Sequence, residues 1–131
     1  FPTEIFGKDA ERLRFLGQEY GTTTGMPRRV GWLDLVMVKS AVKMNGVDWI
    51  ALTRMDTVRE FATNGTVPVC IRYRGGNTEA RFPTVELLSS MHPVYESIRL
   101  SDYVDFIEDY LQIPVKLIGT GPERDDMEIR P

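Results

Sequence analysis

The sequence predicts an α/β fold, in which part of a mixed or parallel sheet is flanked by helices and includes a β-hairpin. Segments with the apolar period of an amphipathic helix alternate along the chain with short apolar runs of strand length. Glycine and proline residues separate many of these segments. Because no repeat, low-complexity tract or linker divides the chain, we expect residues 1–131 to form a single α/β unit.

Three segments have clear helical patterns. Residues 9–18 carry an apolar stripe of Leu13, Phe15 and Leu16 among charged side chains. Residues 32–44 form the strongest pattern, and apolar side chains cover so much of its circumference that we expect burial on several sides. We expect Ser101 to cap a third helix, whose apolar face comprises Tyr103, Phe106, Ile107, Tyr110 and Leu111. Pro83 can start a further short helix that runs to Ser90.

The strand-like segments are short. Residues 67–74 alternate apolar and polar side chains, and the turn 75–77 leads to a returning strand over 78–82, which together predict the hairpin. The remaining predicted strands comprise residues 49–53, 94–98, 113–118 and 127–129.

Composition excludes several classes of protein. The chain has 16 basic and 19 acidic residues and a net charge of −3, which argues against a general binder of nucleic acids or anionic membranes. No apolar stretch approaches the roughly 20 residues of a membrane-spanning helix. The single cysteine, Cys70, cannot form an internal disulfide, so we expect a reducing, cytoplasmic location and a core position for this thiol.

Three loops carry candidate binding chemistry. Residues 21–29 combine glycines that allow close approach, threonine hydroxyls, and the guanidinium groups of Arg28 and Arg29, which suit carboxylate or phosphate. Residues 54–56 and 119–122 follow predicted strands, where α/β sheets bind ligands. From composition alone, an ordinary surface loop or turn is an equally good interpretation of the first and third loops and the better one of the second.

Other candidates have weaker chemistry. His92 is the only histidine and has no partner in a recognisable catalytic motif, so we expect a structural or exposed role. The acidic run 123–128 is expected to be a solvated face, and its spacing matches no metal-binding loop. The sequence contains no Gly-x-x-x-x-Gly-Lys phosphate loop and no nucleophile elbow.

Five motifs in order resemble the adenylosuccinate synthetase family, the GTP-dependent ligases of purine synthesis. The motifs are Phe1-Pro2-Thr3-Glu4, Glu19 to Gly25 followed by Pro27 to Asp34, Leu52-Thr53-Arg54-Met55-Asp56, Pro93-Val94-Tyr95-Glu96 and Thr120 to Arg124. The resemblance runs from Phe1 to Arg130 and covers the carboxyl-terminal third of such enzymes.

The resemblance implies a reaction and a set of binding residues. IMP and L-aspartate would be joined to form adenylosuccinate, with GTP and Mg²⁺, through a 6-phosphoryl-IMP intermediate. The loop that closes over the aspartate carboxylates would comprise Thr22, Thr23, Thr24, Gly25, Met26, Pro27 and Arg28. The GTP-binding residues would be Arg28, Arg54, Met55, Asp56, Gly119, Thr120, Gly121 and Pro122, with Asp56 reading the guanine edge. A homodimer is implied for the full-length enzyme.

The sequence also departs from the family. Met26 stands where the family has an arginine that contacts aspartate and the IMP ribose hydroxyl, Arg54 replaces a lysine, and Gly119 replaces a serine. The Met26 departure predicts weaker aspartate binding or an altered nucleotide preference, for example for a deoxynucleotide.

The family's phosphate loop, general-base aspartate and general-acid histidine match no segment of this sequence. We therefore expect no catalytic residue and no metal ligand in this chain, and no synthetase activity from the chain in isolation. Two alternatives stay open, namely a non-catalytic nucleotide-binding or interaction module of the same fold and a plain α/β scaffold that binds nothing.

Overall fold

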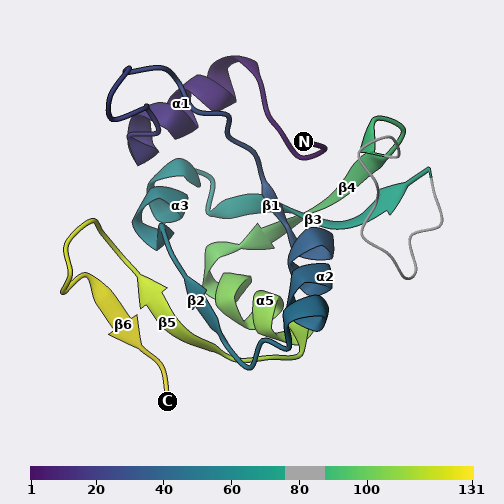
Figure 1. The fold of residues 1–131 in the computed structure, drawn as a ribbon. Helices are drawn as coiled ribbons and strands as arrows, with labels where there is room; N and C mark the ends of the chain where they lie inside the picture. The colour runs from purple at the N-terminus through teal and green to yellow at the C-terminus, as the bar shows by residue number, and fades with distance from the viewer. Residues whose placement is uncertain (76–87) are drawn as a thin grey trace.

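A computed structural model describes residues 1–75 and 88–131 (Figure 1). The predicted hairpin strand 78–82, residues 76–77 of the predicted turn, and residues 83–87 of the predicted short helix lie outside the described residues.

Within the described residues, the strands form two three-stranded mixed sheets. In the first sheet, β3 (Thr66–Arg74) lies between β1 (Leu33–Asp34), to which it is parallel, and β4 (His92–Arg99), to which it is antiparallel. The predicted alternation along β3 is interrupted, because the register against β4 shifts between Cys70 and Arg72. Val69 and Cys70 are consecutive and both fully buried, which agrees with the expected core position of the thiol but breaks the alternation.

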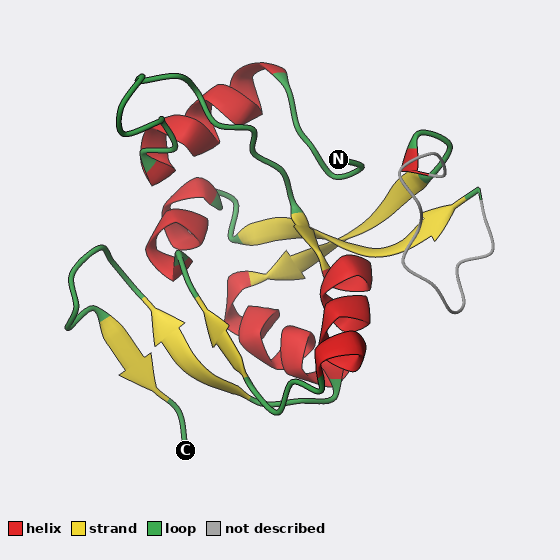
Figure 2. Cartoon of the chain, in the orientation of Figure 1, coloured by secondary structure: helices red, strands yellow, loops and turns green. Residues whose placement is uncertain are grey.

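The second sheet pairs β5 (Val115–Gly119) with two shorter strands. β2 (Ile50–Leu52) runs parallel to β5, and β6 (Met127–Ile129) runs antiparallel to it on the other side. The predicted fold class, a mixed α/β arrangement with helices beside the sheets, is confirmed (Figure 2).

Helices fill the space between and beside the sheets. α2 (Leu35–Asn45) packs against β3 and against α5 (Tyr103–Leu111), and α5 also contacts β4 and β5, so it lies between the two sheets. α1 (Gly7–Gly17) packs on α3 (Met55–Phe61), away from the other two helices (Figure 1). No helix in the described part of the chain is long and apolar enough to cross a membrane.

The predicted helix over 32–44 is wrong at its start and in its burial. Asp34 ends β1 and caps α2, since its Oδ1 accepts a hydrogen bond of 3.1 Å from the Met37 amide, so the helix begins at Leu35. Leu35 and Val42 are its buried residues, whereas Met44 is 75% exposed. Apolar side chains surround α2, but only the side that carries Leu35 and Val42 is buried.

Two further local predictions need correction. Ser101 does not cap α5, because residues Leu100–Asp102 form a 3-10 turn before the helix and the Ser101 hydroxyl donates to Asp102 at 3.1 Å. Phe15 is 75% exposed, so it does not belong to the buried stripe of α1.

The hydrophobic core forms where α2 and α5 meet β3 of the first sheet and β5 of the second. Its most buried large side chains are Leu35, Ile107, Val69, Val115 and Cys70. Burial raises the pKa of the Cys70 thiol to about 11, which keeps the thiol protonated and supports its expected role as a small core residue. The Tyr73 hydroxyl, buried beside this thiol, donates a hydrogen bond to Asp34.

Candidate functional site

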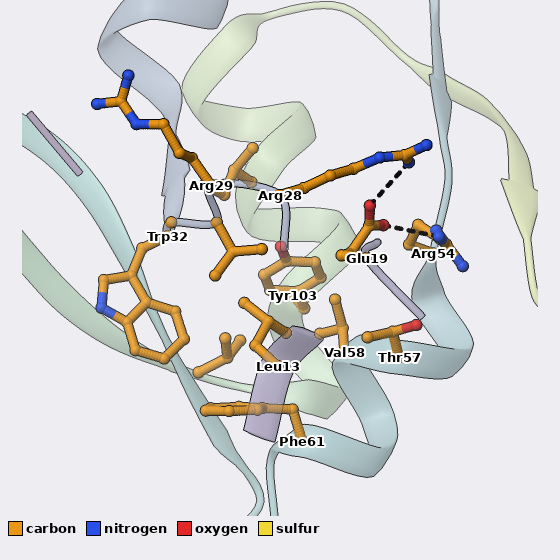
Figure 3. Close-up of a pocket in the computed structure, with 14 residues that line it drawn as sticks. Leu13, Glu19, Arg28, Arg29, Trp32, Arg54, Thr57, Val58, Phe61 and Tyr103 are labelled. Carbon is orange, nitrogen blue, oxygen red and sulfur yellow. Dashed lines mark hydrogen bonds and ion pairs between the residues drawn. The ribbon is translucent and has the colours of Figure 1, made fainter. Parts of the chain in front are cut away.

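A cavity of about 390 Å³ opens between α1, α3 and the segment that leads into β1 (Figure 3). One part of its wall is apolar, and there the Trp32 and Phe61 rings meet edge to face at 5.3 Å between centroids. Tyr103 also lines this part, and burial raises its pKa to about 12, so its hydroxyl stays protonated. The other part is charged and consists of Glu19, Arg28, Arg29 and Arg54.

Glu19 joins two of the predicted binding residues. Its Oε2 accepts from Arg28 Nη1 at 3.1 Å, and its Oε1 accepts from Arg54 Nη2 at 2.7 Å (Figure 3). Arg54 Nη2 also donates to the carbonyl oxygen of Gly17, at 2.8 Å. Sequence reasoning did not select Glu19 as a site residue. One feature of the sequence could have indicated this role, since Glu19 is an acidic residue just before a loop that ends in two arginines.

The loop predicted to bind a carboxylate has a narrow neck. Tyr20 and Pro27 form an isolated antiparallel bridge, and the Arg28 amide donates to the Glu19 carbonyl at 2.9 Å. The two ends of the loop therefore lie next to each other, and the Glu19–Arg28 ion pair joins them.

Inside the neck, the loop is a tight turn. The Gly21 amide donates to the carbonyl oxygen of Met26, and the Gly25 amide donates to the carbonyl oxygen of Gly21, both at 2.8 Å. Gly25 has a φ of +67°, a left-handed conformation that favours glycine. Thr24 Oγ1 accepts from the Met26 amide at 3.3 Å. Thr22 and Thr23 are exposed, and neither side chain makes a hydrogen bond within residues 1–75 and 88–131. Their hydroxyl groups are thus accessible to a ligand.

The guanidinium group of Arg29 points away from that of Arg28, although both residues line the cavity (Figure 3). The Arg29 guanidinium group forms a two-point pair with Glu4, with Nε at 2.8 Å from Oε1, and lies 5.2 Å from the centroid of the Phe1 ring. The pair lowers the pKa of Glu4 and raises that of Arg29. The interpretation that both arginines face one anion is therefore not supported, because Arg29 anchors the N-terminal segment.

The other two predicted loops meet at one edge of the second sheet. Leu52 and Ile118 are aligned on the parallel strands β2 and β5, and a methyl group at Gly119 would lie 3.5 Å from the Thr53 Cα atom. Since both strands run in the same direction, residues 54–56 and 119–122 leave the sheet side by side.

The first residues of α3 have different environments. Arg54 has a φ of +64° and directly precedes the helix, and Met55 is only 2% exposed and packs in the core. Asp56 lies in the first turn, and its Oδ1 atom is buried without a hydrogen-bond partner in the described part of the protein. An unpaired buried acceptor is unfavourable, so a side-chain rotation that exposes this oxygen to a donor would be favoured.

Asp126 organises the loop after β5. The Thr120 amide donates to its carbonyl oxygen and the Glu123 amide to its Oδ2, both at 2.9 Å. A Cβ atom at Gly121 would collide with the Asp126 carboxylate, so any larger residue here would displace that side chain. Pro122 is exposed at the tip of the loop.

The remaining sequence candidates lie apart from the cavity. His92 is exposed at the start of β4, and the acidic run 123–128 is mostly exposed. No group of three His, Cys, Asp or Glu side chains in the described ranges could hold a metal ion.

The sequence is similar to proteins of the adenylosuccinate synthetase family. The family model for adenylosuccinate synthetase matches residues 1–100. The chain is 40% identical over 146 residues to an adenylosuccinate synthetase of Aquifex aeolicus, covering 96% of this chain and 33% of the relative. It is 39% identical over 150 residues to a chloroplastic adenylosuccinate synthetase of Chlamydomonas reinhardtii, covering 100% of this chain and 32% of the relative. The chain thus spans about a third of the length of these relatives.

The fold has a close match among solved structures. A fully ligated adenylosuccinate synthetase from Plasmodium falciparum superimposes with a TM-score of 0.88 at 28% sequence identity. The match covers 100% of this chain and 36% of that structure.

Proposed function

Because this chain belongs to the adenylosuccinate synthetase family, we propose that it supplies the guanine- and aspartate-recognition part of a GTP-dependent ligase. In this proposal, the ligase joins IMP and L-aspartate to form adenylosuccinate. The observation that carries the proposal is the common strand edge at which residues 54–56 and 119–122 meet, with Arg54 linked through Glu19 to Arg28 of the loop.

The guanine base is proposed to lie at the common edge of β2 and β5. Asp56 would accept hydrogen bonds from the ring N1–H and the exocyclic amino group, after a rotation of its side chain that exposes the buried Oδ1. Adenine offers no such pair of donors there and would leave the carboxylate unpaired, so the site would select guanine. Arg54, and the backbone of Gly119, Thr120 and Gly121 with the Pro122 ring, would enclose the base.

The substrate aspartate is proposed to bind at the loop 22–28. Thr22 and Thr23 present accessible hydroxyl groups, and the guanidinium group of Arg28 can pair with a carboxylate. The described residues do not fit an Mg²⁺ site, because they contain no cluster of metal-ligating side chains. Our proposal therefore assigns no step to a metal held by this chain.

The decisive test uses Asp56→Asn in a polypeptide of family length that contains residues 1–131. Loss of a charge-assisted hydrogen bond costs about 1.5–3 kcal/mol, so the KM for GTP should rise by about 10- to 150-fold. A xanthosine nucleotide, whose C2 carbonyl oxygen replaces the guanine amino group and accepts from the new amide, should regain part of the activity. Asp125→Asn is the matched control, because Asp125 is an exposed acidic residue of the neighbouring loop. Equal use of ATP and GTP by the unmodified enzyme would refute the assignment.

The chain alone is proposed to lack synthetase activity, because its sequence contains no glycine-rich phosphate loop. The test is a coupled assay of the purified 131-residue chain with IMP, aspartate, GTP and Mg²⁺. Adenylosuccinate formation above that of a chain-free control would overturn this part of the proposal.

One observation favours a second candidate function, a synthetase with altered nucleotide preference. Met26 is 67% exposed on the loop, and its thioether cannot donate a hydrogen bond to a ribose hydroxyl. A deoxynucleotide would then lose nothing relative to IMP. The test compares IMP with dIMP for the unmodified enzyme and for Met26→Arg. Preference for IMP that the substitution leaves unchanged would exclude this candidate.

A further inference from the structure

We propose that Glu19 is a positioning residue that couples the guanine-binding segment to the aspartate-binding loop, so that occupation of either site raises the affinity of the other. This inference rests on the proposed function and assigns a role to a residue outside the predicted binding set.

The first observation is that one carboxylate serves two arginines. Each oxygen of Glu19 accepts from a different guanidinium group, Oε2 from Arg28 and Oε1 from Arg54 (Figure 3). The side chains of the two arginines are 53% and 48% exposed, whereas that of Glu19 is only 25% exposed. The carboxylate is therefore the better fixed member of the group, and it contributes to the position of both guanidinium groups.

The second observation is that Glu19 is held by the backbone on both sides. Its amide donates to the Arg14 carbonyl and its carbonyl accepts from the Arg28 amide, both at 2.9 Å. Nε of the Arg14 side chain donates to the carbonyl oxygen of Arg28 at 2.8 Å. These bonds connect the end of α1 to the neck of the loop, so a change at the Glu19 carboxylate is transmitted to the loop rather than lost in a flexible segment.

The third observation concerns Arg54. Its guanidinium group is fixed at two points, by Glu19 and by the Gly17 carbonyl, which leaves the aliphatic part of the side chain to cover a base. A base that packs on Arg54 restricts this side chain and, through the shared carboxylate, restricts Arg28. When aspartate binds, Arg28 has already lost part of its conformational entropy, so less entropy is lost in this second binding step. The two binding events are therefore positively coupled. Thermodynamic linkage makes the effect reciprocal.

Glu19→Gln tests this inference in a polypeptide of family length that contains residues 1–131. The amide has one acceptor oxygen instead of two, so it can serve only one arginine while keeping the shape of the side chain. In the unmodified enzyme, a saturating non-hydrolysable GTP analogue should lower the Kd for aspartate by about fivefold or more, within the usual range of coupling energies. Glu19→Gln should reduce this ratio to about one. It should also raise the KM for both substrates, while kcat changes less than twofold.

Glu4→Gln is the matched control. It makes the same change in a carboxylate that pairs with an arginine of the same segment, but Glu4 and Arg29 lie outside the Arg28–Glu19–Arg54 group. We expect the control to keep the coupling ratio of the unmodified enzyme. Thermal unfolding of both variants shows whether either is simply destabilised.

Three results would overturn the inference. They are an unchanged coupling ratio in Glu19→Gln, a loss of kcat with both KM values unchanged, and an equal loss of coupling in Glu4→Gln. The proposed function fails in a different way, since it would be refuted by an unmodified enzyme that shows no dependence on guanine nucleotide or aspartate. An enzyme that uses both substrates and is insensitive to Glu19→Gln would refute the coupling alone.

Discussion

The two sheets of this protein differ in what their side chains contact. The first sheet contains β3, on which Val69, Cys70 and Tyr73 are almost completely buried against helices. The second sheet ends in β6, whose three residues are all exposed, and the carboxyl ends of β2 and β5 lead into the candidate binding loops. Both sheets contribute to the core, since Val115 and Ile118 of β5 are also buried, but only the second sheet combines a buried strand with an exposed edge and with the candidate loops.

The largest test of this comparison is Leu35→Ala. Leu35 is fully buried in the core beside the first sheet, so removing most of its side chain leaves a cavity. We expect the free energy of unfolding to fall by about 2–5 kcal/mol, as measured by urea unfolding followed by tryptophan fluorescence. A loss below about 1 kcal/mol would show that the core does not depend on this sheet as we describe.

A somewhat smaller effect is expected from Asp34→Ala. Asp34 caps α2 and accepts from the buried Tyr73 hydroxyl, so its removal leaves an uncapped helix and an unpaired donor. The expected loss is about 1–3 kcal/mol by the same measurement. Asp34→Asn keeps an acceptor for the helix amide and should recover part of the loss; equal losses in both variants would contradict the capping role.

Two glycines, Gly119 at the end of β5 and Gly121 in the loop that follows it, should respond differently to alanine. At Gly121 the new methyl group would displace the Asp126 carboxylate and break its bond to the Glu123 amide, at a cost of about 1 kcal/mol. At Gly119 the methyl group would make an ordinary contact with Thr53, and the less flexible unfolded chain offsets any cost, so stability should change by less than about 0.5 kcal/mol. Thermal melts of the two variants give the comparison, and the reverse order would disprove the packing described for this loop.

The smallest effect is expected at the exposed edge. Ile129 is 81% exposed on β6, so Ile129→Ala should change the free energy of unfolding by no more than about 0.5 kcal/mol. A loss comparable to that of Leu35→Ala, again in urea, would mean that the exposed β6 edge carries a substantial part of the stability.

Much of the fold was predictable because local patterns decide it. The last strand matches residues 127–129 as predicted, and β2 and β5 fall within one residue of their predicted spans at most boundaries. The sequence did not predict α3, because it is short and begins directly after Arg54, whose positive φ no local pattern requires. The start of α2 was missed because the capping bond of Asp34 outweighs the apolar residues before it.

The candidate site was predictable in its loops but not in its connections. Both strand-end loops could be located because parallel strands place their carboxyl ends at one edge. The pairing of Arg29 with Glu4 joins residues far apart in the sequence, and the same is true of Arg54 with Glu19. No periodicity or motif encodes such pairs, so which arginine stays available and which is anchored becomes evident only in three dimensions. The roles of the binding residues themselves stay predictions.

The parallel pairing of β2 with β5 also has a consequence for how the protein folds. Ile50 and Val115 become neighbours only after most of the chain between them is brought together, whereas β3 and β4 are joined by the much shorter connection 75–91. Because closing a longer loop costs more entropy before any contact compensates it, the second sheet should form after the first. The edge that carries the candidate binding loops would then be the last part to assemble, and Val115 and Ile118 of β5 would complete the hydrophobic core only at that stage.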